Sequence, residues 1–333
     1  MNVAIFGGTG FVGSYLVDEL LANGHLPRLL TRAGSEVKIS RPDDCATITG
    51  DISDLAAVRR VIDGVDAVIY NIGILKEQPE QGITFEALHF EGARVAMDLA
   101  KDAGVKRFLL MSANGVKADG TRYQRTKHQA ERYLQASELD WTIFRPSVIF
   151  GDPRGQMEFA TQLYRDLVAS VFPAPMFHDG ILPSGAGSLQ LAPVFVKDVA
   201  RIFVQSLSRQ DSLGQTLCLG GPQSLSWKRI LQTIGQATGR RVSGLPTPAW
   251  AVKALAVLLD GWDIMPITAD QLTMLLEGNT CDSAAVYLAY GIEPTAFSSD
   301  NLRYLNSPTV PVSRANHTSP AASMSANRSV AQG

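Results

Sequence analysis

Short apolar runs alternate with segments of helical periodicity along the first half of the chain. Val12, Leu16 and Leu20 have helical spacing, Ser53 is expected to begin a helix over residues 54–62, and Thr84 is expected to begin one that ends before Gly104. The apolar runs predict six buried strands, at residues 3–6, 28–30, 46–49, 66–71, 107–111 and 141–144. Strands alternating with helices predict an α/β fold with a doubly wound parallel sheet, whose ligand lies at the carboxyl ends of the strands.

The pattern is looser after Gly151, where a smaller α/β lobe is expected. Residues 173–193 are rich in proline and glycine and predict a long loop. Strands are expected at residues 194–196 and 216–219, and helices at 198–207, 226–238, 250–259 and 269–277. We therefore expect a Rossmann-type core over residues 1–150, an interleaved lobe over 151–305 that offers a substrate cleft, and a disordered, Ser- and Ala-rich tail over 306–333.

Composition and charge narrow the class of partner. The chain has 333 residues, 45% of them hydrophobic, and a net charge of −2 without a block of basic residues, so nucleic acid is not an expected partner. The three cysteines are far apart, and neither they nor the five histidines have metal-ligand spacing, so we expect no disulfide framework and no metal site.

The apolar segment 248–259 leaves two interpretations open. Flanked by Trp250 and Trp262, it can offer a surface to a membrane, a quinone or a partner protein, or it can be a core helix of the lobe, which we favour. It contains Lys253 and is too short to span a bilayer, and the first strand at residue 3 predicts no leader segment. We expect a cytoplasmic protein, with a place at the periphery of the inner membrane as the alternative.

A glycine-rich turn directly follows the first strand. In Gly7-Gly8-Thr9-Gly10-Phe11-Val12-Gly13, Gly7 permits a sharp turn, Gly10 lets a pyrophosphate approach the backbone, and Gly13 lets the next helix pack closely on the sheet. The helix N-terminus then faces the anion. The loop predicts a dinucleotide site with contacts from Gly7, Thr9, Gly10, Phe11, Val12 and Gly13; the plain alternative is a glycine-rich turn that binds nothing.

The end of the second strand bears on which dinucleotide is bound. An acid there would favour NAD, but the chain has Thr31-Arg32. An arginine accommodates the 2′-phosphate of NADP, so we predict that NADP(H) is preferred over NAD(H), with a solvated surface arginine as the alternative. Gly73, beyond the fourth strand, would let the backbone lie close to the cofactor.

Tyr123 and Lys127 form the candidate catalytic pair. They are four residues apart on a predicted helix and therefore lie on one face. The ammonium of Lys127 is expected to lower the pKa of the Tyr123 phenol, so that the phenol exchanges a proton with a carbonyl while hydride moves; Lys127 can also bind the nicotinamide ribose. The alternative is a chance surface pair.

These motifs together resemble those of extended or atypical short-chain dehydrogenases/reductases over residues 1 to about 305. The matching pieces are the glycine loop, Gly50-Asp51-Ile52, Tyr123-x-x-x-Lys127 with Glu131, Arg145-Pro146-Ser147-Val148-Ile149-Phe150-Gly151 and Val196-Lys197-Asp198-Val199-Ala200. Within the superfamily, residues 70–75 and 219–222 are most similar to the subgroup of the nucleotide-binding accessory subunit of respiratory complex I.

The resemblance implies further cofactor contacts and one departure. Asp51 and Ile52 would flank the adenine, Asn71, Ile72 and Gly73 would line the cleft, and Pro146 and Val148 would pass near the nicotinamide; Asp51 could equally be an acid at a helix start. The serine or threonine that binds the substrate carbonyl in active members is replaced by Asn114, with Ser112 as the other candidate.

Three functional hypotheses follow. The first is an NAD(P)H-binding oxidoreductase that transfers hydride to or from a carbonyl, alcohol or quinone-like substrate, with Tyr123, Lys127 and Asn114 or Ser112 as catalytic residues. The second is a non-catalytic subunit that holds NADPH and serves the assembly or stability of a quinone-linked respiratory membrane complex. A nucleotide-sensing regulator is a third, less favoured, hypothesis.

Overall fold

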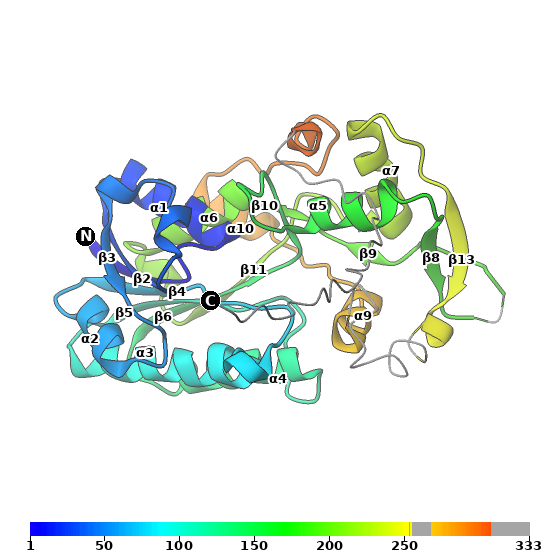
Figure 1. Cartoon of the computed structure of the whole chain (residues 1–333). Coiled ribbons are helices and arrows are strands. Elements are labelled where there is room, and N and C mark those ends of the chain that lie inside the picture. The colour runs from blue at the N-terminus through cyan, green and yellow to red at the C-terminus, as the bar shows by residue number, and fades with distance from the viewer. Residues whose placement is uncertain (181, 253, 255–267, 308–333) are drawn as a thin grey trace, which may run out of the picture.

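A computed structural model describes residues 1–180, 182–252, 254 and 268–307, and the statements below concern these ranges (Figure 1). Its centre is a seven-stranded parallel sheet in the order β11-β6-β5-β4-β1-β2-β3. The strands are β1 (Asn2–Phe6), β2 (Leu26–Thr31), β3 (Ala46–Thr49), β4 (Ala67–Tyr70), β5 (Arg107–Met111), β6 (Asp140–Pro146) and β11 (Gln215–Leu219). The doubly wound parallel sheet predicted from the alternating pattern is thus confirmed.

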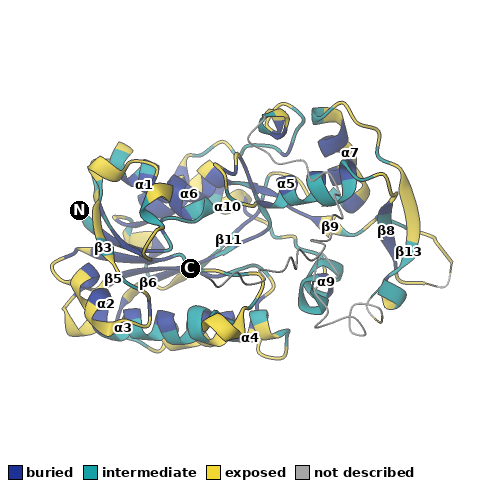
Figure 2. Ribbon diagram, in the orientation of Figure 1, coloured by how far each residue is buried: buried dark blue, intermediate teal, exposed yellow. Residues whose placement is uncertain are grey.

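Two layers of helices cover the sheet. One face carries α1 (Phe11–Ala22), α6 (Val196–Ser206) and α10 (Ala284–Tyr290), and the other carries α2 (Leu55–Ile62), α3 (Gly92–Asp102) and α4 (Arg122–Gln135) (Figure 1). The central strands are buried between the layers (Figure 2). Burial on both faces explains why β1, β4 and β5 are continuous apolar runs in the sequence rather than alternating ones.

The structure corrects the predicted start of one helix and adds a π-helical stretch to the start of another. Asp54, not Ser53, caps α2, because its carboxylate accepts hydrogen bonds from the N–H groups of Ala56 and Ala57. Thr84 accepts from the N–H of Ala87 as expected, but the helix that it begins opens with a π-helical stretch, η4 (Glu86–Glu91), before α3. Such stretches are frequent at functional sites, and this one adjoins the candidate site.

The lobe is built from segments that leave the central sheet. It contains α5 (Phe159–Leu163), the π-helical stretch η5 (Tyr164–Val168), α7 (Trp227–Ala237), α9 (Ala269–Leu276) and the short strands β7 (Ile149–Phe150), β9 (Gln190–Leu191), β10 (Val194–Phe195) and β12 (Leu225–Ser226). Its core includes Phe150, Trp227 and Leu272. Between these segments the chain returns to the main sheet through α6 and β11, so the core and the lobe share residues after 150.

The predicted loop at residues 173–193 is wrong in part. Residues 174–178 form β8 (Ala174–His178), which pairs in parallel with β13 (Gly244–Pro248), and β9 also lies within the segment. Pro175 and Pro246 are tolerated because the two strands form a two-stranded ribbon in which each has a free edge. The partner strand is distant in sequence, so local composition could not indicate the pairing.

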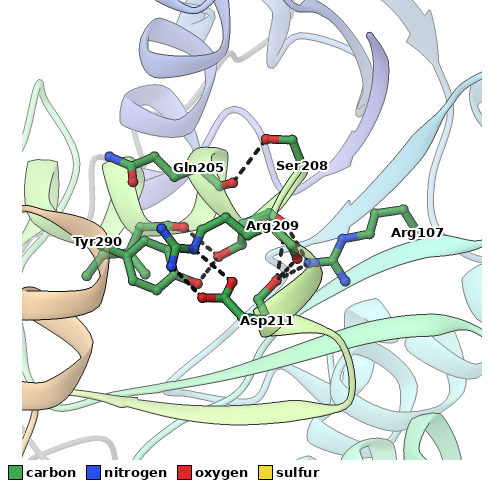
Figure 3. A network of polar contacts seen from close by, with 9 residues as sticks. Arg107, Gln205, Ser208, Arg209, Asp211 and Tyr290 are labelled. Carbon is green, nitrogen blue, oxygen red and sulfur yellow. Dashed lines mark hydrogen bonds and ion pairs between the residues drawn. The ribbon is translucent and has the colours of Figure 1, made fainter.

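A buried arginine ties α6 and the segment before β11 to the start of the sheet (Figure 3). Arg107 donates hydrogen bonds to the carbonyl oxygens of Asp140 and Ser206 at 2.7 and 2.6 Å and to the hydroxyl of Ser212 at 2.9 Å. Burial lowers its pKa to about 10. Beside it, the Tyr290 hydroxyl bonds that of Ser206 at 2.7 Å. This network holds the layers together at the amino ends of the strands, opposite the predicted ligand edge.

Two regions of the sequence analysis lie outside the described residues. They are most of the apolar segment 248–259, with Trp262, and the predicted disordered tail beyond residue 307. Among the helices that the structure describes, none has the length and apolar character needed to cross a membrane.

Candidate functional site

The glycine loop between β1 and α1 has the geometry expected of a phosphate-binding turn. Gly7 has a φ of +87°, and a Cβ there would lie 2.9 Å from the carbonyl oxygen of Asn71. A Cβ at Gly13 would lie 2.1 Å from the carbonyl oxygen of Gly7, so α1 packs against the turn as only glycine allows. A Cβ at Gly10 would meet only that same oxygen, at an ordinary 3.5 Å. The backbone at Gly10 is therefore open on its outer side.

The N-terminus of α1 fits an anion. Gly10 is the N-cap, and there is no side-chain capping hydrogen bond at this end of the helix. Phe11 and Val12 begin the helix, and the N–H groups of a first turn have no partners within the helix. With the positive end of the helix dipole behind them, these groups and the open face of Gly10 fit the pyrophosphate of a dinucleotide. Thr9 lies in the same turn, where its carbonyl oxygen accepts from Gln156 at 3.2 Å.

Arg32, Asp51 and Ile52 follow the ends of two paired strands. Arg32 comes directly after β2 and is exposed, while the N–H of Gly50 bonds the carbonyl oxygen of Thr31. Asp51 accepts hydrogen bonds from the backbone and hydroxyl of Ser53 at 3.1 Å, which is the local role of an acid before a helix. The side chain of Ile52 is buried in the core against Gly92.

The segment after β4 lies between the glycine loop and α4. The Asn71 amide donates to the carbonyl oxygen of Gly7 at 3.4 Å. The carbonyl oxygen of Ile72 accepts from Lys127 Nζ at 3.1 Å, and a Cβ at Gly73 would lie 3.8 Å from the same nitrogen. The residues that the sequence assigned to the cleft wall thus contact both the glycine loop and the candidate catalytic lysine.

Lys127 is fixed at the carboxyl edge of the sheet. Its ammonium donates to the carbonyl oxygens of Ile72, after β4, and Met111, at the end of β5, the latter at 3.0 Å. The residue is only 3% exposed. Burial lowers the pKa of Lys127 to about 8, against a smaller opposing effect of the Glu131 carboxylate. Lys127 is thus fixed at the edge where a doubly wound sheet binds its ligand.

Tyr123 lies one helical turn before Lys127 and packs in an aromatic cluster. Its ring meets those of Phe85 and His89 edge-on, with centroids 5.7 and 5.0 Å away. Burial raises the pKa of Tyr123 to about 12. The expectation that Lys127 lowers this pKa is wrong for this structure, in which burial raises it. The phenol is protonated at neutral pH.

Neither candidate carbonyl donor is free. Ser112, 3% exposed, donates its hydroxyl hydrogen bond to the Glu131 carboxylate at 2.5 Å, and Glu131 also forms an ion pair with Arg145. The Asn114 amide donates to the side-chain oxygen of Asn279 at 2.8 Å and to the carbonyl oxygen of Thr280 at 3.0 Å. Both donors are thus directed at protein acceptors, Ser112 within the core and Asn114 at a segment before α10.

The strand-end residues Pro146 and Val148 lie beside that segment. The carbonyl oxygen of Pro146 accepts from the N–H of Asn114 at 2.9 Å, and that of Val148 accepts from Val194. Between them, the Ser147 hydroxyl donates to the carbonyl oxygen of Asn279 at 2.8 Å. Backbone contacts therefore join the strand end of β6 to Asn114.

His89 is a site residue that the sequence analysis missed. It lies on the π-helical stretch η4, is 1% exposed and stacks on Phe85 at 5.2 Å. Its Nε2 accepts from the N–H of Ile74 at 3.1 Å, so the ring proton lies on Nδ1, which faces the Thr126 hydroxyl at 3.3 Å. Burial, with the charge of Lys127, lowers the pKa of His89 to about 2. A lone histidine in a helical segment gives no signal in the sequence that it will be buried beside Tyr123.

The sheet order and the glycine loop define a Rossmann-type α/β fold, in which such a loop fits the pyrophosphate of a dinucleotide. Residues 7–169 match the model of the family described as NAD(P)H-binding. The confirmed fold and the family agree with the resemblance found in the motifs.

Similar proteins include reductases and respiratory subunits. The chain is 26% identical over 267 residues to a ceramide reductase of Caulobacter vibrioides, covering 80% of each protein. It is 27% identical to the mitochondrial NADH-ubiquinone oxidoreductase 40 kDa subunit of Neurospora crassa, covering 92% of this chain and 79% of that one. Among solved structures, the UDP-glucose 4-epimerase of Thermus thermophilus in complex with NAD has the same fold, with a TM-score of 0.68 at 17% identity, over 92% of this chain and 97% of that one.

Proposed function

We propose that the protein is an NADP(H)-dependent reductase of a carbonyl or quinone-like substrate. The observation that carries this proposal is the position of Lys127, whose ammonium is held by the carbonyls of Ile72 and Met111 at the carboxyl edge of the sheet, one turn from Tyr123. That edge is where a doubly wound sheet binds its nucleotide. The similarity to a ceramide reductase supports reduction as the direction of the reaction.

Different residues of the chain would bind the cofactor, donate the proton and bind the substrate oxygen. Gly7, Gly10 and Gly13 shape the turn that takes the pyrophosphate, and the first N–H groups of α1 donate to it. Lys127 would bind the nicotinamide ribose, and the bound dinucleotide would supply hydride. Tyr123, whose phenol is protonated at neutral pH, would donate the proton to the substrate oxygen. For Asn114 to bind that oxygen, its amide must leave Asn279 and Thr280.

Selectivity for NADP(H) is assigned to Arg32. The residue is exposed immediately after β2, where the adenosine ribose of a dinucleotide lies, and no acid stands at that position. A guanidinium there can form charge-assisted hydrogen bonds to a 2′-phosphate.

A second candidate function is supported by the hydrogen bonds of Asn114 and Ser112. With both donors committed to protein acceptors, the chain would hold NADPH as a structural ligand and contribute to the assembly or stability of a respiratory membrane complex. The similarity to the Neurospora 40 kDa subunit supports this alternative. On the lobe, the side chains of Val171, Phe172 and Leu245 are exposed apolar groups that such a contact would cover.

The deciding experiment measures what the purified protein carries and whether it turns over. NADPH released by denaturation would be identified by mass, and its oxidation by carbonyl compounds and by short-chain quinones followed at 340 nm. Oxidation at a rate proportional to enzyme concentration supports the reductase. NADPH that survives dialysis and is oxidised by neither class of acceptor supports the structural subunit.

A further inference from the structure

Cys218 and Cys281 lie together although the sequence separates them widely. Cys218 is on β11, at the edge of the main sheet, and Cys281 lies in the segment that precedes α10. The Cys281 sulfur lies 2.9 Å from the place where a Cβ would stand on Gly220, two residues past Cys218. Ser283 connects the two residues, because its hydroxyl donates to the carbonyl oxygen of Cys218 at 2.9 Å and contacts the Cys281 sulfur at 3.5 Å. The two thiols are therefore neighbours held by a third residue.

The pair is accessible and chemically asymmetric. Both cysteines are partly buried, and Cys281 lines an open cavity of about 890 Å³ together with Gly221 and Tyr287. Arg145 is the neighbour of Cys218 in the strand register. Interaction with Cys281 and the charge of Arg145 lower the pKa of Cys218, while interaction with Cys218 and burial raise that of Cys281. Cys218 is the member of the pair that carries thiolate character.

We propose that Cys218 and Cys281 form a reversible oxidation site for small peroxides. The Cys218 thiolate attacks a peroxide oxygen, so that an S–O bond forms, the O–O bond breaks and one water is released after protonation. The Cys281 sulfur then attacks the sulfenic acid, forming the S–S bond and releasing a second water. Each sulfur loses one electron, and the two electrons reduce the peroxide; a dithiol reductant reverses the step by exchange.

Oxidation would fasten the segment before α10 to the sheet. The segment already binds Asn114 through Asn279 and Thr280, and Ser147 through Asn279. A bond from Cys281 to β11 would add a covalent tie a few residues along the same segment. Oxidation of the pair would therefore restrict the segment whose residues accept hydrogen bonds from Asn114. This effect does not depend on the role of Asn114 in turnover.

The test uses the chain's third cysteine as an internal control. Cys45 is also partly buried, but burial and nearby Asp44 raise its pKa. The full-length protein would be treated with stoichiometric hydrogen peroxide, alkylated and analysed by peptide mass spectrometry. We expect a Cys218–Cys281 disulfide that dithiothreitol reverses, with Cys45 recovered as the alkylated thiol. In Cys281→Ser, dimedone should label Cys218; in Cys218→Ser, Cys281 should remain a thiol.

Three results would overturn the proposal. They are oxidation of Cys45 at the same rate as Cys218, disulfides found between chains rather than within one, and dimedone labelling of Cys281 in Cys218→Ser. Thermal unfolding of each serine variant shows that it is folded before its thiols are compared. All readouts follow thiol chemistry in the absence of substrate, so they do not depend on whether the protein is a reductase.

Discussion

The side-chain amide of Asn114 donates a hydrogen bond to the side-chain oxygen of Asn279 at 2.8 Å. With the second bond, to the carbonyl oxygen of Thr280, both amide hydrogens are used. A carbonyl substrate can therefore receive a hydrogen bond from Asn114 only by competing with these acceptors. Of these two acceptors, only the side-chain oxygen of Asn279 can be removed by a substitution.

Asn279→Ala is accordingly expected to increase reductase activity. Removing the side-chain acceptor frees one N–H of Asn114, and a hydrogen bond of about 1 kcal/mol corresponds to an increase of about fivefold in kcat/KM. Asn279→Asp, which keeps an acceptor, is the control and should leave the rate unchanged. Steady-state NADPH oxidation measures both, and an equal rate in all three proteins would show that Asn114 takes no part.

Tyr123→Phe should separate binding from turnover. The phenol is the proton donor in the proposed reaction, and loss of a positioned acid lowers rates by roughly 10²- to 10⁴-fold. Affinity for NADPH, measured by fluorescence titration, should stay within about twofold, because the ring and its contacts with Phe85 and His89 remain. Unchanged turnover would remove Tyr123 from the mechanism.

Arg32→Ala should weaken NADPH binding and leave NADH binding unchanged. Hydrogen bonds to a charged group contribute about 1.5–3 kcal/mol, so the Kd for NADPH is expected to rise at least about tenfold. Arg41→Ala is the matched control, since Arg41 is also exposed but pairs with Asp44 at 2.7 Å. Equal effects of Arg32→Ala on the two nucleotides would rule out contact with the 2′-phosphate.

Alanine substitutions at two glycines of the same loop should affect different properties, the stability of the fold at Gly13 and the binding of NADPH at Gly10. At Gly13 a Cβ would come within 2.1 Å of the Gly7 carbonyl oxygen, so Gly13→Ala is expected to destabilise the fold by about 1–3 kcal/mol. At Gly10 the nearest atom is 3.5 Å away, so Gly10→Ala should cost at most about 1 kcal/mol of stability but obstruct the pyrophosphate. Urea unfolding and NADPH titration of each variant distinguish the two effects; strong NADPH binding by Gly10→Ala would contradict the assigned site.

The sequence predicted those parts of the fold that depend on interactions between residues close together in the chain. Strands buried on both faces, such as β1 and β4, are apolar runs that end at turn residues, and the glycine loop requires its glycines for steric reasons. The pairing of β8 with β13 depends on contacts between distant segments and left no local pattern. The same is true of the Asn114–Asn279 bond and the Cys218–Cys281 pair, because spacing along the chain does not reveal proximity in space.

His89 should make the folded state sensitive to acid. Its pKa is about 2 in the folded protein and 6.5 ordinarily, so between these values the unfolded chain binds one more proton and stability falls as the pH falls. At 1.36 kcal/mol per unit, this group accounts for a loss of about 2 to 3 kcal/mol between pH 7 and pH 4.5. His89→Asn cannot titrate there, so it should lose less stability than the wild type over this interval, by that amount. Urea unfolding at the two pH values measures the difference. Phe85→Leu, in the same aromatic cluster but without a titratable group, should keep the wild-type dependence. If His89→Asn and the wild type lose equal stability on acidification, His89 is not held neutral in the folded protein.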